Sequence, residues 1–64
     1  MKLPCGLELD LDAMPDGRWL WTVSADGQVR ARGYTDDRPA ALAVGRQAAL
    51  RVLWRSQQIL DRME

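Results

Sequence analysis

The sequence predicts an α+β domain in which a three-stranded antiparallel meander is followed by one C-terminal helix packed on one face of the sheet. Two observations lead to this fold class. Three short segments in the first half alternate apolar and polar residues, and turns containing glycine separate them; a long alanine-rich segment follows. Alternation with a period of two is typical of half-buried strands, whereas apolar residues three and four apart indicate an amphipathic helix.

The first predicted strand covers about residues 7–13, where apolar residues share one face and acidic residues share the other. A Pro-Asp-Gly turn separates it from the second strand, at about residues 18–24, which is rich in aromatic and β-branched residues. A three-residue loop at this turn pairs Leu9 with Val23. The third strand covers about residues 28–34.

The register of the second hairpin depends on the length of its turn. A two-residue turn at Asp26-Gly27 would set Val23 opposite Arg30 and mix the core face with the solvent face. A three-residue loop that begins one residue earlier sets Val23 opposite Val29 and keeps one face apolar. We therefore predict the three-residue loop.

The outer face of this predicted sheet carries opposite charges at its two edges. Its acidic edge consists of Glu8, Asp10 and Asp12, and its basic edge of Gln28, Arg30 and Arg32. Two interpretations stay open: a solvated face whose edge charges discourage aggregation, or a bipolar surface for a partner or for edge-to-edge dimerisation between an acidic and a basic strand. Clustered carboxylates can hold a divalent cation, but their spacing here matches no calcium loop, so we predict no metal site.

The predicted helix covers about residues 37–62, and Thr35 or Asp36 is expected to cap its N-terminus. Its first half presents small residues to the sheet, so we expect close packing against Trp19 and Trp21. The complete core-facing stripe is Ala41, Leu42, Gly45, Ala48, Ala49, Val52, Leu53, Ser56, Ile59, Leu60 and Met63.

Two apolar residues of the helix do not belong to this stripe. Leu50 and Trp54 are four residues apart and lie roughly opposite the core, near Gln47 and Gln57. An exposed tryptophan beside an exposed leucine is more typical of a contact surface than of solvated helix. These residues are the predicted partner-binding site; the other interpretations are an isolated surface pair or a terminal loop that folds over it.

Three arginines, Arg51, Arg55 and Arg62, follow one flank of the same helix and form the candidate nucleic-acid site. The chain as a whole is neutral, with nine basic and nine acidic residues, but the charges are segregated. Residues 1–37 hold four basic against seven acidic side chains, and residues 38–64 hold five against two. Since phosphate binders usually carry a net positive charge, a solvated helix face is the competing interpretation.

The length of 64 residues allows one domain, residues 1–64, and no second one. A domain this small buries only about 60% of its unfolded surface, so self-association is a common route to stability. The single cysteine, Cys5, excludes an internal disulfide, and we interpret it as a small apolar residue near the N-terminus. The chain has no histidine, which is the commonest metal ligand and general base.

The sequence also bears on location. Its first residues lead to Pro4 without the apolar run of a signal peptide. No segment approaches the roughly 20 apolar residues that a membrane-spanning helix needs. We therefore expect a cytoplasmic protein without membrane contact.

Residues 21–53 resemble two known families. The segment ALAVGRQAALRVL is similar to the helix in the C-terminal half of double-stranded RNA-binding domains. That family grips phosphates with lysines at the helix start, where this chain has Asp36-Asp37-Arg38, so no binding residue is carried over. Gly33-Tyr34-Thr35-Asp36 is similar to the entry into the helix of HicB-type antitoxin-like domains, and this resemblance implies a non-catalytic partner of another protein.

These observations favour a small non-enzymatic binding or regulatory module of the kind found among bacterial and phage accessory proteins. Catalysis by paired carboxylates needs side chains that converge in a cleft, whereas those of this chain alternate on an open strand face. We predict no cofactor. The expected partner is another protein or a second copy of the chain as a homodimer, and nucleic acid bound by a dimer is the alternative.

Overall fold

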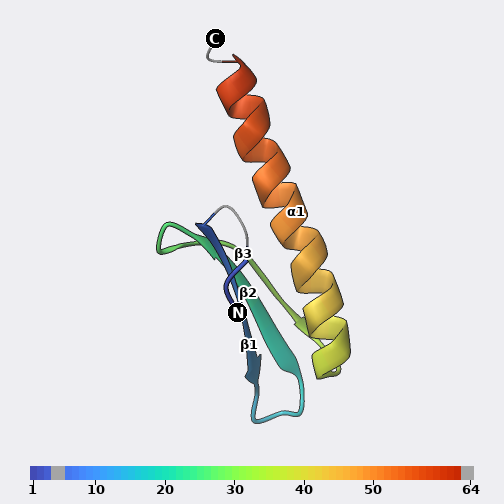
Figure 1. The fold of residues 1–64 in the computed structure, drawn as a ribbon. Coiled ribbons are helices and arrows are strands. Elements are labelled where there is room, and N and C mark those ends of the chain that lie inside the picture. Colours follow the sequence, from blue (N-terminus) through green and yellow to red (C-terminus); the bar gives the residue numbers. More distant parts are fainter. Residues whose placement is uncertain (4–5, 63–64) are drawn as a thin grey trace.

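The computed structural model describes residues 1–3 and 6–62, with side chains for residues 1–3 and 6–55. Strands β1, β2 and β3 form an antiparallel sheet in that order, and helix α1 lies against one face of it (Figure 1). Their bounds are Leu7–Ala13 for β1, Trp19–Ala25 for β2, Gln28–Thr35 for β3 and Arg38–Arg62 for α1. The predicted fold class is confirmed, and each predicted boundary lies within one residue of the observed one.

The first hairpin has the predicted register, with Leu9 opposite Val23. Its loop ends at Gly17, whose φ of 89° lies in the left-handed region that glycine adopts without strain. The Asp16 carboxylate accepts hydrogen bonds from the backbone N–H of Arg18 at 3.1 Å and from its Nε at 2.8 Å. Both bonds lower the pKa of Asp16, and the bond from the backbone N–H of Arg18 is the larger cause.

The second hairpin differs from the prediction. Its turn has two residues, Asp26 and Gly27, with φ values of 54° and 79°. Positive φ at both central positions defines the type I′ turn, whose twist matches that of the flanking strands and which Asp-Gly favours. The predicted three-residue loop is therefore wrong.

A β-bulge explains how the two-residue turn still keeps one face apolar. Ser24 lies opposite Val29, but Val23 lies opposite Ala31, so Arg30 is an extra residue in β3. Because side chains alternate between the two faces, the extra residue moves Gln28 and Val29, which precede it in β3, to the face opposite to the predicted one. Val29 consequently shares the outer face with Ser24 and is 61% exposed, instead of facing the core as predicted.

The core lies between the sheet and the first four turns of α1. Its buried residues are Leu7, Leu9, Trp21, Val23, Ala41 and Ala49. Trp21 lies opposite Gly33 in the neighbouring strand. A Cβ at Gly33 would come within 2.8 Å of the indole, so the ring occupies the space that a side chain there would need.

Close packing of small helix residues on the sheet is confirmed, but the prediction that tryptophans fill the space is only partly right. Trp21 is in the core and Trp19 is half-buried beside it. At Gly45, however, a Cβ would lie 2.5 Å from Leu9 Cδ1. The leucine, not an indole, therefore fills the gap that this glycine leaves. The stripe beyond Leu53 lies outside the described side chains.

The N-terminus of α1 is capped by Asp37, not by Thr35 or Asp36 as predicted. The Asp37 carboxylate accepts a hydrogen bond from the backbone N–H of Ala40 at 2.8 Å. Thr35 instead donates its hydroxyl to the carbonyl of Asp37 at 2.9 Å. The capping aspartate satisfies a backbone donor that has no partner within the helix.

Residues 1–3 pair with the free edge of β1. Leu3 N donates to Leu7 O and Leu9 N donates to Met1 O, both at 2.8 Å. Lys2 lies opposite Glu8 in an antiparallel bridge. The first half of β1 therefore has backbone partners on both sides, and Cys5 lies outside the described residues.

Helix α1 is longer than the sheet that it covers. Its 25 residues extend about 37 Å at 1.5 Å per residue, whereas strands of at most eight residues span about 27 Å. Figure 1 shows α1 continuing past the end of the sheet, on the side where β1 begins. The residues around Leu50 and Trp54 lie near the point at which the helix leaves the sheet.

Candidate partner-binding site

The predicted apolar pair lies on the surface of α1. Leu50 is 67% exposed and Trp54 is 62% exposed. Gln47 is exposed on the same helix, and the side chain of Gln57 lies outside the described residues. Two large apolar side chains one helical turn apart thus remain in solvent. A partner that buried their apolar surface would be stabilised in its complex by about 25 cal/mol for each Å² removed from water.

An apolar groove lies beside this pair, between α1 and the start of β1. It is lined by Leu3, Leu7, Arg46, Ala49, Leu50 and Leu53 and has a volume of about 270 Å³. A second hollow of about 360 Å³ continues it along the helix, lined by Leu50, Arg51, Leu53 and Trp54. Because the two hollows share Leu50 and Leu53, they form one surface, which we call the α1 groove.

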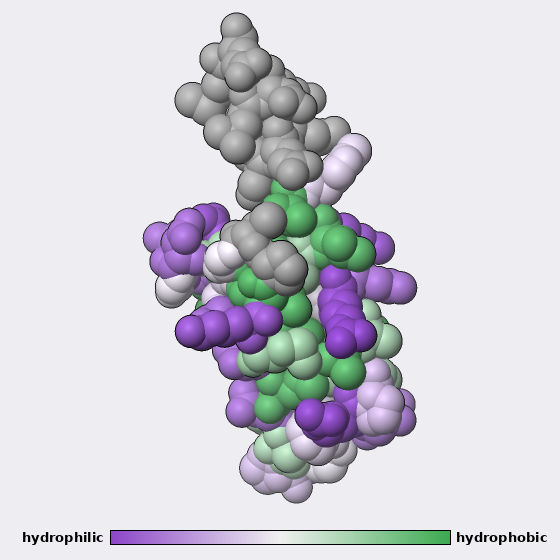
Figure 2. Space-filling model, viewed as in Figure 1, coloured by the Kyte–Doolittle hydropathy of each residue, from purple (hydrophilic) through white to green (hydrophobic). Residues whose placement is uncertain are grey.

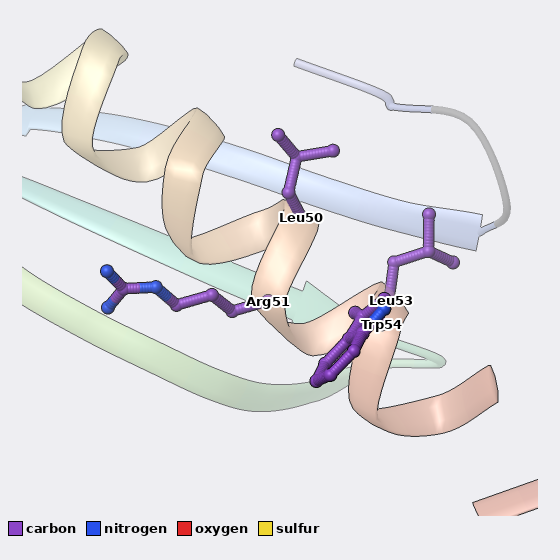
Figure 3. Close-up of a pocket in the computed structure, with 4 residues that line it drawn as sticks. All are labelled: Leu50, Arg51, Leu53 and Trp54. Atoms are coloured by element: carbon purple, nitrogen blue, oxygen red, sulfur yellow. The ribbon is translucent and has the colours of Figure 1, made fainter. Parts of the chain in front are cut away.

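Figure 2 shows apolar side chains gathered along the middle of one face of the molecule, with hydrophilic side chains on both sides. The close-up in Figure 3 separates the groove residues by direction. Leu50 and Leu53 point to the side of α1 that carries β1, whereas Arg51 and the Trp54 indole point to the other side. The two leucines therefore form the floor and wall next to β1, and the indole extends the apolar surface across the helix.

The backbone along the α1 groove has few free hydrogen-bonding groups. Leu3 and Leu7 are paired with each other through Leu3 N and Leu7 O, and Leu9 is paired with Met1. On the opposite wall, Ala49 to Leu53 are inside α1, where backbone groups bond within the helix. The groove consequently offers side-chain contacts rather than a strand edge.

Arginines border the groove and have no neutralising partner among the side chains that the structure describes. Arg46, Arg51 and Arg55 are exposed, and none forms an ion pair with the described residues. No aspartate or glutamate occurs between Arg38 and Leu60 in the sequence. Of the predicted arginine stripe, Arg51 and Arg55 are on the surface as expected, and the side chain of Arg62 lies outside the described residues.

The outer face of the sheet carries a second set of exposed side chains. Glu8, Asp10 and Asp12 are exposed along β1, as predicted. The predicted basic edge is altered by the bulge, because Val29 takes the place of Gln28 on this face of β3; Arg32 and Tyr34, which follow the bulge, lie on the outer face as alternation predicts. Val29 is 61% exposed and Tyr34 is 54% exposed. The guanidinium of Arg18 lies 4.7 Å from the centre of the tyrosine ring, a cation–π distance.

Sequence reasoning found the pair at the centre of the groove but missed its walls. Leu53 was assigned to the core, and the structure shows it half-buried, with one part in the core and another in the groove. Leu3 and Leu7 belong to the groove because residues 1–3 fold back along β1. Pro4 and Gly6 in the sequence between these two segments were the available turn signals, and Gly6 has a φ of 76°, but no strand was predicted before them.

Among the described residues, no three or more histidine, cysteine, aspartate or glutamate side chains are grouped so that they could hold a metal ion. Within the same part of the chain, no helix has the length and apolar character needed to cross a bilayer.

Comparison of the chain with models of protein families, with curated proteins and with solved structures finds no match.

Proposed function

We propose that this chain is a small non-enzymatic binding module of the cytoplasm that acts through a protein–protein interface on the α1 groove. One observation carries the proposal: Leu50 and Trp54 are 67% and 62% exposed and adjoin an apolar groove. Aromatic anchors beside such a surface are typical of the residues that dominate the binding energy of interfaces. Leu50, Trp54, Gln47 and Gln57 are the proposed contact residues.

The chemistry of the groove supports a macromolecular partner over a small molecule. Small-molecule sites combine an apolar cavity with several polar groups that converge on the ligand. The described lining of the groove is apolar except for Arg46 and Arg51, which border it. A lining of this kind is suited to the side chains of another polypeptide.

The position of the carboxylates supports a non-enzymatic role. Glu8, Asp10 and Asp12 are exposed and alternate along β1 on the face of the sheet opposite α1. Their backbone positions alternate with those of buried leucines, so they spread along an open surface instead of enclosing a cleft. General acid–base catalysis requires groups that reach one substrate atom together.

The test is a comparison of proteins retained by three immobilised forms of the chain. The double substitution Leu50→Ser and Trp54→Ser should abolish specific retention, because it removes both anchors from an exposed surface without touching the core. The matched control, Val29→Ser with Tyr34→Ser, removes apolar area from the outer sheet face and should retain the same proteins as the unmodified chain. Equal retention by all three forms would contradict the proposal.

Nucleic-acid binding through Arg51, Arg55 and Arg62, with two stripes joined in a dimer, is a second candidate function. It is favoured by the exposure of Arg51 and Arg55 and by the absence of ion pairs to them among the described residues. Three phosphate contacts per chain would give a log–log salt dependence of about −0.9 per contact. A fluorescent duplex titrated at several salt concentrations measures this slope, and no binding at low salt would exclude the function.

A further inference from the structure

We infer that the occupant of the α1 groove is an acidic amphipathic helix of another polypeptide. This inference rests on the proposed function, because it specifies the partner class for the same surface. It follows from three properties of the groove: its small number of free backbone groups, the spacing of its apolar residues, and the charge of its borders.

The paired backbone of the groove disfavours strand addition. A strand that binds an edge needs unpaired N–H and C=O groups to complete its own hydrogen bonds. Here the Leu3–Leu7 and Met1–Leu9 bonds already occupy the edge of β1 beside the groove, at 2.8 Å each. An occupant must therefore satisfy its backbone by itself, and the element that does so is an α-helix.

The apolar residues of α1 have the spacing that such a helix fits. Leu50, Leu53 and Trp54 lie at positions i, i+3 and i+4, and Arg46 precedes them by one turn. Helices that bind in grooves present the same i, i+3, i+4 and i+7 pattern of apolar anchors. The walls formed by Leu3 and Leu7 add apolar surface on the side of β1.

The borders of the groove determine the charge of the occupant. Arg46 lines the hollow next to β1, and Arg51 lines the hollow next to Trp54. Arg55 follows Arg51 by one turn. All three are exposed and have no ion pair among the described residues. A second copy of α1 would bring more arginines to this face, whereas glutamates beside the anchors of a partner helix would pair with them.

The experiment is a selection from helical peptides displayed on yeast, using the full chain as the target. The library fixes leucines at i, i+3 and i+7 and randomises the flanking positions among Glu, Gln and Lys. We expect enriched peptides to carry Glu at the flanks. Their affinity should fall about tenfold for the variant Arg46→Gln, Arg51→Gln, Arg55→Gln. Each exposed ion pair contributes little, and the loss of three together corresponds to about one factor of ten in Kd.

Two variants serve as references. Arg30→Gln, Arg32→Gln, Arg38→Gln removes the same charge away from the groove and should bind the peptides as the unmodified chain does. Leu50→Ser, Trp54→Ser should lose binding altogether, with circular dichroism verifying that it is folded.

Each other result has a distinct meaning. Enrichment of Gln or Lys flanks, or equal affinity for both arginine variants, would overturn the acidic helix while leaving the groove as a binding site. A doubling of molar mass that Leu50→Ser, Trp54→Ser removes would identify a second copy as the occupant and overturn it as well. If no peptide is enriched above the level of Leu50→Ser, Trp54→Ser, the helical occupant is overturned, while the proposed function stands or falls with the retention comparison.

Discussion

At the scale of single residues, two glycines define how closely the layers of the core approach. Gly33 leaves room for the Trp21 indole within the sheet, and Gly45 leaves room for Leu9 between the sheet and α1. In both places the space that a Cβ would fill is occupied by a large apolar side chain. Small residues in this chain are therefore part of the packing rather than weak points in their elements.

The substitution Gly45→Ala tests whether packing or helix propensity has the larger effect on stability at this position. Alanine is favoured over glycine by about 1 kcal/mol inside a helix, so propensity alone would stabilise the variant. The new Cβ would lie 2.5 Å from Leu9 Cδ1, however, and overpacking of this kind costs about 1–3 kcal/mol. We expect a net decrease in the free energy of unfolding, measured by urea denaturation.

A double-mutant cycle with Leu9→Val tests the assigned contact. If the clash is with Leu9, Leu9→Val should cost less in the Gly45→Ala background than in the unmodified chain. The control is Ala43→Gly at an exposed position of α1, which should lose about 1 kcal/mol through propensity alone. Additive effects in the cycle would show that the added methyl contacts something else.

At the scale of elements, the bulge in β3 is what separates the observed sheet from the predicted one. Alternation in β1 and the apolar face of β2 determine the first register, because a slip of one residue would expose every buried leucine. Val29-Arg30-Ala31 has no comparable pattern. A bulge inserts one unpaired residue into a strand, and no particular residue type marks its position. The alternation of apolar and polar residues therefore cannot locate it.

The register of β3 is tested by two valines. Val23 is fully buried, and its truncation to alanine should cost about 2 kcal/mol, since it removes buried methyl groups and leaves a cavity. Val29 lies on the outer face, and Val29→Ala should change the free energy of unfolding by less than about 0.5 kcal/mol. Comparable losses for both variants would instead favour the three-residue loop, which places both valines in the core.

The cap of α1 shows a similar limit of prediction. Three consecutive residues, Thr35, Asp36 and Asp37, can each cap a helix, and the sequence does not distinguish between them. The choice depends on where β3 ends, at Thr35, and on the turn that joins it to α1. The partner-binding pair was predictable because it departs from a strong periodic pattern, whereas the groove walls depend on a chain reversal at residues 1–3.

Asp37→Ala should destabilise the chain by about 1 kcal/mol, because it leaves the Ala40 N–H without its partner. Asp36→Ala is the matched control: it removes the same charge beside the same helix end, but this carboxylate has no hydrogen bond to a described residue. Thermal unfolding of both variants compares them. A larger effect from Asp36 would place the cap there instead.

At the scale of the whole molecule, the carboxylates of β1 and the arginines of α1 lie on opposite sides of the sheet, and Arg32 shares the outer face with the carboxylates. The acidic side chains of β1 project from the outer face of the sheet, and the arginines of α1 lie on the helix that covers the other face. The exposed arginines make the α1 side positively charged, and such a field steers charged partners before contact. The association rate constant of a charged partner at the α1 groove should therefore fall as the salt concentration rises.

The same charge distribution predicts the state of the chain in solution. Two α1 grooves facing each other would bring the arginines of both copies together, so we expect a monomer of 7.2 kDa at concentrations up to about 100 µM in low salt. Light scattering over a concentration series measures the mass. A dimer under these conditions would mean that apolar burial outweighs the repulsion.

The fold-back of residues 1–3 also determines the valence of the sheet, the number of chains that can be added at its edges. A sheet with two open edges can grow indefinitely in both directions, as a polymer with two reactive ends does. Here the chain itself shortens one end: among the described residues, that edge consists of residues 1–3 and of Asp10–Ala13 of β1, each fewer than the about five residues of an ordinary strand. The edge of β3 is the longest one left, so edge pairing is expected there, and a pair joined through β3 leaves only short segments for further addition.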